Sequence, residues 1–200
     1  DANVYVYYPE EFGDEGLMAP LGKSISHIEF CYDYELTATK TAEAQYTRTY
    51  TWTIDKSVDP AAHVGFAGDM FESNYDVALD QTVVDSDFAV AGTITVSNPT
   101  PFTVDFTVTD SVGGVPVTVT CPTYSLAPRA STVCTYSASL GGMVNGTNTA
   151  TIATMDLYVE GAVATADYLF GDPTTVVGYE TVGVTDSVQG PLGAASGDIT

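Results

Sequence analysis

Hydrophobic and polar residues alternate along most of the chain. The clearest run covers residues 46–58, where mostly aromatic and aliphatic side chains occupy the even positions and threonines occupy many odd ones. Neighbouring side chains of a β-strand point to opposite faces, so a period of two predicts strands. The same pattern recurs in residues 2–8, 26–36, 75–79, 88–96, 102–108, 115–119, 149–154, 157–169 and 176–186. We therefore expect about nine or ten strands, and no segment has clear helical spacing.

Turn-forming pairs separate these segments. Examples are Asp59-Pro60, Asn98-Pro99, Gly113-Gly114, Asn145-Gly146 and Asp172-Pro173. Short strands divided by such turns are typical of an antiparallel sandwich. A parallel α/β sheet would need helical crossovers, which the sequence does not offer, so nucleotide-binding α/β folds are excluded. The expected fold is an all-β, antiparallel, immunoglobulin-like sandwich with extra flanking strands.

The pattern divides the chain into three parts. Residues 37–175 form the expected sandwich, and residues 1–36 are expected to form an N-terminal hairpin that includes a possible donor strand. Residues 176–200 are expected to hold one strand and a flexible tail, because residues 190–197 are rich in glycine and alanine. An isolated hairpin is marginal in water, so each flank needs something to pack against. The flanks are either parts of neighbouring domains in a longer protein or strands completed by other copies.

Composition and charge exclude some classes of binding partner. The chain is 44% hydrophobic, yet no apolar run approaches the roughly 20 residues that cross a bilayer. With 26 acidic against 5 basic residues, its formal net charge is -21, which repels nucleic acid and anionic lipid alike. We therefore expect no nucleic-acid partner and no membrane insertion. The imbalance comes from missing Lys and Arg, as in secreted or salt-adapted proteins, although a cation-binding protein would share it.

The three cysteines indicate the compartment. Cys121 and Cys134 flank a predicted turn at the ends of neighbouring strands, a placement that brings two Cα atoms within disulfide range. We predict a disulfide between them; the alternative is a pair of buried thiols. A disulfide implies an oxidising, extracellular location. Cys31 is left over and either finds a partner outside this chain or stays a buried free thiol.

Four stretches together resemble the immunoglobulin-like repeat domains of bacterial and archaeal secreted multidomain surface proteins. They are residues 47–60 (TRTYTWTIDKSVDP), 92–99 (GTITVSNP), 119–122 with 131–136 (VTCP, STVCTY) and 145–151 (NGTNTAT). The resemblance covers about residues 25–200 and implies a fold and a cell-surface or extracellular address, but hardly an activity. Related chains often carry a cysteine where Thr181 follows Glu180 here, which removes one candidate partner for Cys31.

Related pilin and adhesin sandwiches suggest one covalent reaction. They join a buried first-strand lysine to a last-strand asparagine with the help of an acid. By that resemblance Lys56 and Asn148 are the candidate isopeptide pair, and Asp76 is the first candidate acid. Asp105 and Asp110 are the alternative acids. The competing interpretation is a solvated lysine at a strand end, because only a dry site gives a lysine the lowered pKa of a nucleophile.

No catalytic constellation is visible, and we expect no enzyme. The only histidines, His27 and His63, have no nucleophile placed beside them by any motif. No protein metal site is assigned. A bound Ca²⁺ is the one possible cofactor, with Asp85 and Asp87, or Asp76 and Asp80, as hard oxygen ligands, although no EF-hand loop is present.

Asn145 begins the sequon Asn145-Gly146-Thr147 in a predicted loop, so it is a possible N-glycosylation site. The threonine-rich strand faces are possible sites for O-linked glycans.

The leading functional hypothesis is a non-enzymatic extracellular structural protein. It would be a subunit or segment of a pilus-like surface filament, with copies of itself as partners. An open strand edge is a template for a strand from another chain, and donor-strand complementation polymerises subunits in this way. The alternating N-terminal segment, with Val4, Val6 and Tyr8, is the candidate donor strand. The alternative is a monomeric adhesin or spacer that binds a glycan or protein through its loops.

Overall fold

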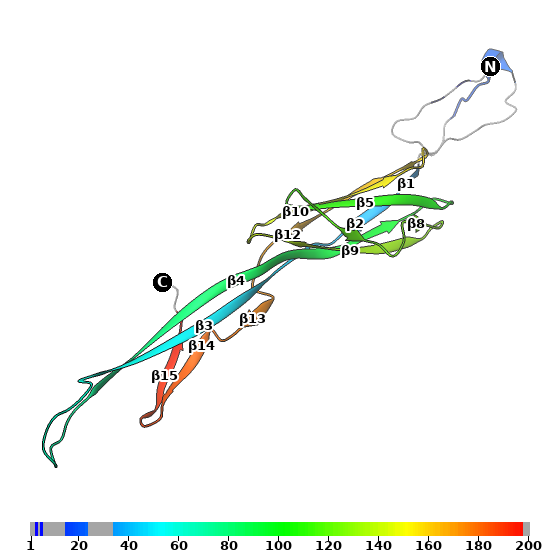
Figure 1. Cartoon of the computed structure of the whole chain (residues 1–200). Helices are drawn as coiled ribbons and strands as arrows, with labels where there is room; N and C mark the ends of the chain where they lie inside the picture. Colours follow the sequence, from blue (N-terminus) through cyan, green and yellow to red (C-terminus); the bar gives the residue numbers. More distant parts are fainter. Residues whose placement is uncertain (1–2, 4, 6–14, 24–33, 198–200) are drawn as a thin grey trace. The chain divides into compact units, whose positions relative to one another are not determined.

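The computed structural model describes residues 3, 5, 15–23 and 34–197 (Figure 1). The described residues form fifteen strands and one 3₁₀ turn, η1 (Pro20–Gly22). The prediction of an all-β fold is confirmed. Contacts divide the chain into two units, residues 1–33 and 34–200. In the first unit the Asn3 side-chain amide donates to the Met18 carbonyl at 2.8 Å. The predicted strands within residues 2–8 and 26–33 otherwise lie outside the described residues.

The second unit contains two main sheets. The six-stranded sheet has the order β13-β3-β4-β9-β7, with β2 also paired to β4. The five-stranded sheet has the order β12-β10-β5-β6, with β8 also paired to β5. Within these sheets all pairs are antiparallel except β13 with β3. The bounds are β2 (Thr37–Lys40), β3 (Glu43–Asp59), β4 (Asn74–Ser97), β5 (Val104–Val112), β6 (Val115–Val117), β7 (Val119–Thr120), β8 (Ser125–Leu126), β9 (Ser131–Ser139), β10 (Gly146–Thr154), β12 (Ala162–Tyr168) and β13 (Thr175–Val177).

The two sheets face each other across one hydrophobic core, and we call this part the body. Strands β4, β5, β9 and β10 each send alternate side chains inward, as their period of two requires. Fully burying one such aliphatic side chain contributes about 1.5–3 kcal/mol. The most deeply buried apolar residues are Leu36, Val90, Ile94, Val96, Val104, Val112, Cys134, Ala150 and Ile152.

The start of the second unit runs along the edge between the two sheets. Strand β1 (Tyr34–Glu35) pairs in parallel with β11 (Val159–Glu160), which immediately precedes β12 of the five-stranded sheet. After Leu36, which is 1% exposed, the chain continues as β2 and pairs with β4 of the other sheet. The inward alternation therefore extends through Leu36 and Ala38 to Lys40, whose side chain is fully buried.

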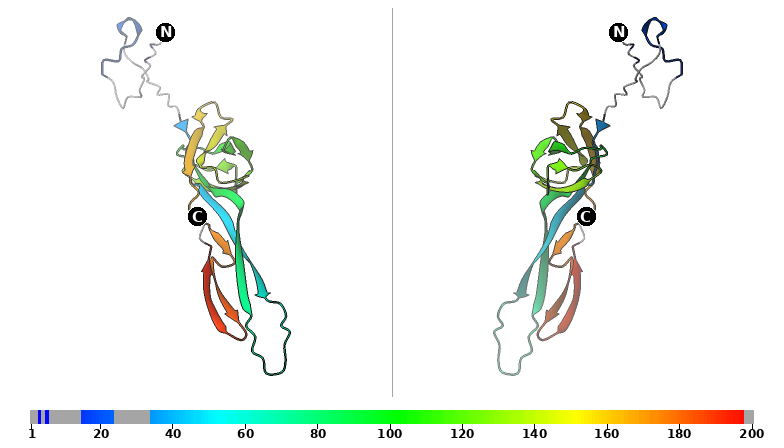
Figure 2. Two further views of the ribbon diagram at one scale, coloured as in Figure 1. Left: turned by 90° about the vertical axis from the view of Figure 1, so that its left-hand side faces the viewer. Right: turned by 90° about the vertical axis from the view of Figure 1, so that its right-hand side faces the viewer.

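Strands β3 and β4 continue past the body as a two-stranded ribbon (Figure 2). We define the ribbon as residues 50–59 and 74–84. Its apolar face carries Trp52, Ile54, Lys56, Val58, Tyr75, Val77, Leu79 and Gln81, which pair across the two strands. The opposite face carries residues such as Thr53, Asp55 and Asp80.

A β-bulge marks the junction of body and ribbon. Asp87 and Phe88 of β4 lie opposite the single residue Tyr46 of β3, where the register shifts. Asp87 has a positive φ of 56°, a conformation that aspartate tolerates better than most residues. The extra residue lets Tyr46 and Phe88 stack at 5.9 Å between ring centroids.

The last strands correct the sequence interpretation. Residues 176–186, expected as one strand, are divided between β13 and β14 (Thr181–Asp186), with Gly178 at a φ of 82° between them. Residues 190–197, expected to be flexible, contain β15 (Gly190–Ser196), which pairs with β14 to form the C-terminal hairpin. The Asp186 carboxylate accepts the amide hydrogens of Val188 and Gln189 at 2.8 and 2.9 Å and closes the turn. Main-chain pairing thus orders a segment that has no side-chain pattern.

Candidate functional site

Lys40, Asp110, Tyr136 and Asn148 are polar side chains at inward positions, which the alternation mostly gives to apolar residues. Lys40 lies on β2 and Tyr136 on β9, both in the six-stranded sheet, whereas Asp110 lies on β5 and Asn148 on β10 in the five-stranded sheet. All four are therefore directed into the space between the sheets. We call them the buried cluster.

Lys40 and Asp110 form the charged part of the cluster. Lys40 Nζ donates to Asp110 Oδ2 at 2.9 Å, and both side chains are 0% exposed. The same Nζ lies 3.6 Å from the centroid of the Tyr136 ring, within cation–π range. Burial lowers the pKa of Lys40, while the hydrogen bond and charge of Asp110 partly oppose that shift. The ammonium is therefore held by one carboxylate and one ring, and it loses its proton more readily than a solvated lysine.

Asn148 is the unusual member. It is 0% exposed, and neither its Nδ2 nor its Oδ1 has a hydrogen-bond partner among the described residues. A buried unsatisfied polar group costs about 1–3 kcal/mol. The register places Asn148 opposite Val112 and Ala150 opposite Asp110, so Asn148 and Asp110 are diagonal neighbours on the same inner face. The side-chain amide of Asn148, which has no hydrogen-bond partner among the described residues, therefore lies beside the Lys40–Asp110 pair.

Tyr136 is the fourth member of the buried cluster. Its hydroxyl donates to the Thr41 carbonyl at 2.5 Å. Burial raises the pKa of Tyr136 to about 12; the nearby Asn148 side chain opposes the rise, and the charges of Asp110 and Glu43 add to it. No hydrogen bond of good geometry joins Tyr136 and Asn148, since both polar atoms of the amide lack partners in the described structure. The phenol thus remains neutral at physiological pH.

The structure corrects the predicted isopeptide set. Lys56 lies in the ribbon, where its Nζ donates to Asp186 at 2.6 Å and its side chain is 46% exposed. Asp76 is exposed and pairs with Ser57, also in the ribbon, while Asp105 faces outward from β5. The choice of Lys56 with Asp76 is therefore wrong. Asn148 and the alternative acid Asp110 do lie together, and the lysine beside them is Lys40.

Sequence reasoning missed Lys40 because the predicted strand ended at residue 36. Lys40 could have been found by extending the alternation past residue 36, because Leu36, Ala38 and Lys40 occupy successive inward positions. A charged residue at the next inward position of such a series is unusual, because charges are rarely buried without a partner.

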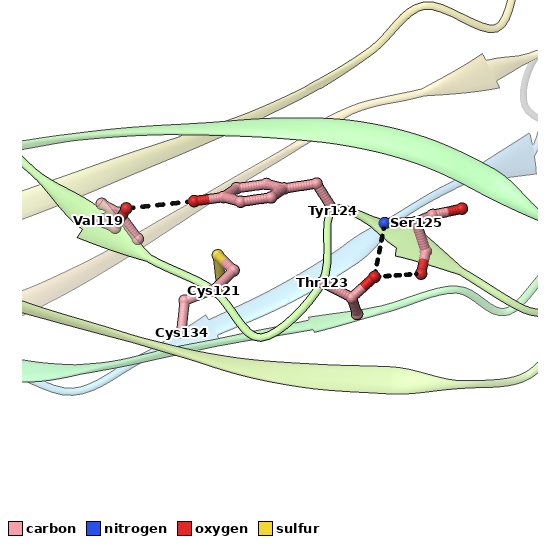
Figure 3. Close-up of a disulfide and its surroundings, with 6 residues drawn as sticks. All are labelled: Val119, Cys121, Thr123, Tyr124, Ser125 and Cys134. Atoms are coloured by element: carbon pink, nitrogen blue, oxygen red, sulfur yellow. Dashed lines mark hydrogen bonds between the residues drawn. A yellow bond between two sulfur atoms is a disulfide. The ribbon is translucent and has the colours of Figure 1, made fainter.

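The predicted disulfide is confirmed. Cys121, just after β7, is bonded to Cys134 in β9, and their Cα atoms are 4.2 Å apart (Figure 3). In the same loop the Tyr124 hydroxyl donates to the Val119 carbonyl at 3.3 Å. A disulfide is compatible with secretion into an oxidising compartment. Among the residues that the structure describes, no helix is long and apolar enough to span a bilayer.

The other predicted site residues have different outcomes. Cys31, Val4, Val6 and Tyr8 lie outside the described residues. Asn145 is exposed, and its Oδ1 accepts the amide hydrogen of Phe170 at 2.8 Å, so glycosylation there stays a prediction.

Of the candidate calcium ligands, Asp85 is already engaged by Arg48. The guanidinium binds both carboxylate oxygens, at 2.7 and 2.8 Å, and this contact lowers the pKa of Asp85. In the part of the chain that the structure describes, no three His, Cys, Asp or Glu side chains are grouped so that they could hold a metal ion.

The chain was compared with models of protein families, with curated proteins and with solved structures. None of the three comparisons gives a match. The geometry of the chain itself therefore carries the functional argument.

Proposed function

We propose that this protein is a non-enzymatic structural module of the extracellular surface. In this proposal it is an immunoglobulin-like subunit or segment of a pilus-like filament, and copies of the chain assemble by strand exchange. The observation that carries the proposal is the ribbon, which combines free strand edges with exposed apolar side chains.

The free edges follow from the pairing pattern. In the described residues, β9 pairs with β4 only from Ala89 to Ser97, and β13 pairs with β3 only from Thr47 to Thr49. Beyond those points the two strands of the ribbon pair only with each other. Each therefore has one outer row of main-chain groups available to another strand, which is a template for strand addition.

The apolar face of the ribbon is only partly covered. The C-terminal hairpin and the residues before it contact this face through Trp52 Nε1, which donates to the Tyr179 carbonyl at 2.7 Å. Gln81 Nε2 donates to the Glu180 carbonyl at 2.9 Å. Ile54 and Tyr75 nevertheless remain 64% exposed each. Exposed apolar side chains beside a free strand edge can pack against the alternating apolar side chains of a strand from another copy.

The alternating segment with Val4, Val6 and Tyr8 is the donor in this proposal. Its period of two would supply apolar side chains to one face while its main chain pairs with the free edge. Deleting residues 1–10 is expected to abolish filaments and leave a soluble monomer, as judged by negative-stain imaging and sedimentation.

A second variant tests the acceptor. Ile54→Thr with Tyr75→Thr should also reduce assembly, whereas the matched control Thr53→Ser with Asp76→Asn, on the opposite face, should not. Filaments of normal length from the chain without residues 1–10 would overturn strand exchange by this segment.

One observation favours the alternative of a monomeric adhesin. The loop between β3 and β4 exposes Val64, Phe66 and Met70 by 96%, 88% and 97%. Exposed apolar side chains clustered at a loop are typical of a binding surface. Compact beads in place of filaments, together with binding to cell-surface glycans or proteins that Phe66→Ser removes, would support this function.

A further inference from the structure

The buried amide of Asn148 raises a chemical question. Buried polar groups in folded proteins nearly always have partners, and an exception calls for an explanation. Among the described residues the two polar atoms of the Asn148 side chain are the only buried side-chain atoms without one. They lie in a dry space shared with an amine and a carboxylate.

We propose that Lys40 and Asn148 become joined by an intramolecular isopeptide bond, with Asp110 as the proton carrier. The bond would link β2 of one sheet to β10 of the other. The crosslink belongs to the folded body of a single chain, so it does not depend on the assembly proposed above.

The amine meets the requirements of a nucleophile. An ammonium must lose a proton before its nitrogen can attack a carbonyl carbon, and burial favours the neutral amine. Asp110 Oδ2 already accepts a hydrogen bond from Lys40 Nζ at 2.9 Å, so the acceptor for that proton is in place. Both side chains are 0% exposed, which keeps water from competing with the amine.

The reaction balances without any further reagent. Lys40 Nζ gives one proton to the Asp110 carboxylate and attacks Cγ of Asn148, and the carbonyl electrons move to Oδ1. Asp110 then delivers a proton to Nδ2, and the amine nitrogen gives up its second proton through the same carboxylate. The Cγ–Nδ2 bond breaks, ammonia leaves, and a secondary amide joins Nζ to Cγ. The carboxyl group of Asp110 is left to hydrogen-bond the new amide.

The product resolves the two unfavourable features of the cluster. The buried ammonium becomes a neutral amide nitrogen, and the unsatisfied Asn148 amide acquires a covalent partner. The bond also ties the short β2, which has four residues, to the central strand β10 of the opposite sheet. Tension entering from residues 1–33 would then pass from Lys40 directly to Asn148.

Intact mass and a tryptic map test the proposal on the purified, folded protein after reduction of the disulfide. We expect the mass to lie about 17 Da below the sequence mass, the loss of one ammonia. A succinimide at Asn145-Gly146 would lose the same mass, so the map must locate the change. Trypsin should fail to cleave after Lys40, and residues 24–48 should remain attached to residues 130–200.

Matched variants test the role of each residue in the proposed bond. Lys40→Met, Asn148→Ala and Asp110→Asn should each restore the full mass, whereas Lys56→Met and Asn145→Ser should keep the loss. Circular dichroism checks that each variant folds, and the wild-type map decides the question if a variant does not. An unshifted mass of the folded wild-type protein, or cleavage after Lys40, overturns the bond. Retention of the loss in folded Asp110→Asn overturns the proton-carrying role of Asp110.

Discussion

Among the described residues, one lysine–aspartate pair lies inside the body and another joins the ribbon to the C-terminal hairpin, and the pKa values of the two lysines shift in opposite directions. In the body, Lys40 and Asp110 are 2.9 Å apart and fully buried, and burial lowers the pKa of the lysine. Between the ribbon and the C-terminal hairpin, Lys56 and Asp186 are 2.6 Å apart with side chains 46% and 13% exposed, and the hydrogen bond from Lys56 to Asp186 raises the pKa of the lysine. Burial therefore decides whether the pKa of a lysine that contacts an aspartate lies below or above its ordinary value.

Removal of each aspartate should give the largest contrast. Asp110→Ala prevents proton transfer and leaves Lys40 buried without a counter-charge, which costs about 3–5 kcal/mol. Asp186→Ala leaves Lys56 in contact with solvent, so the free energy of unfolding should change far less. Urea titrations of both variants measure the difference. Equal losses would show that burial does not separate the two pairs.

Removal of the disulfide should have the next largest effect, and in the body alone. Cys121→Ala with Cys134→Ala opens a loop with a sequence separation of 13, for which the chain-entropy model gives a loss of roughly 3 kcal/mol. Guanidinium unfolding followed by circular dichroism should show that loss. The native fluorescence of Trp52, the single tryptophan, should not change, because its indole contacts Tyr179 beside the ribbon. An altered native spectrum would mean that the ribbon senses the body.

A pH titration that follows the contact between the ribbon and the C-terminal hairpin should produce the smallest effect. The pKa of Asp186 is lowered from 3.8, first by Lys56, so its stabilisation is present above 3.8 and is lost as the pH falls through the folded pKa. The pKa of Lys56 is raised from 10.5, so its contribution is present below 10.5 and is lost as the pH rises through the folded pKa. Trp52 fluorescence should change at both extremes and should respond less in Lys56→Gln. A wild-type response that this variant retains would exclude the ion pair as its cause.

The alternation of residues was enough to predict the all-β fold and the hairpin that carries the disulfide. It could not separate the body from the ribbon, because a period of two shows which side chains share a face but not what covers that face. Ile54 and Ile94 both belong to such a series, yet one is 64% and the other 0% exposed. The same limit led to Lys56 in place of Lys40, since burial arises from contacts between strands far apart in sequence.

The bulge also hid the length of β4. Residues 75–79 and 88–96 were expected as separate strands, and their apolar positions are odd in the first and even in the second. The structure joins them in one strand of 24 residues, with the extra residue at Asp87 accounting for the change of parity. The sequence also could not predict that the side chain of Asn148 lacks hydrogen-bond partners, because hydrogen bonding depends on the three-dimensional surroundings of a group.

The long pairing of β3 with β4 makes the molecule unequally tolerant of insertions and deletions. In the loop of residues 60–73, a codon gained or lost changes only the length of a connection. A single-codon deletion at Asp87 would only remove the bulge, because Gln45 would still pair with Ala89 and Thr47 with Ser86. A deletion at Val84 would instead shift the far half of β4 by one position, and Asp80 and Thr82 would take the places of Gln81 and Val83 on the apolar face. Homologous chains that keep the same body and ribbon should therefore vary in length in the loop and conserve the spacing between Leu79 and Ser86.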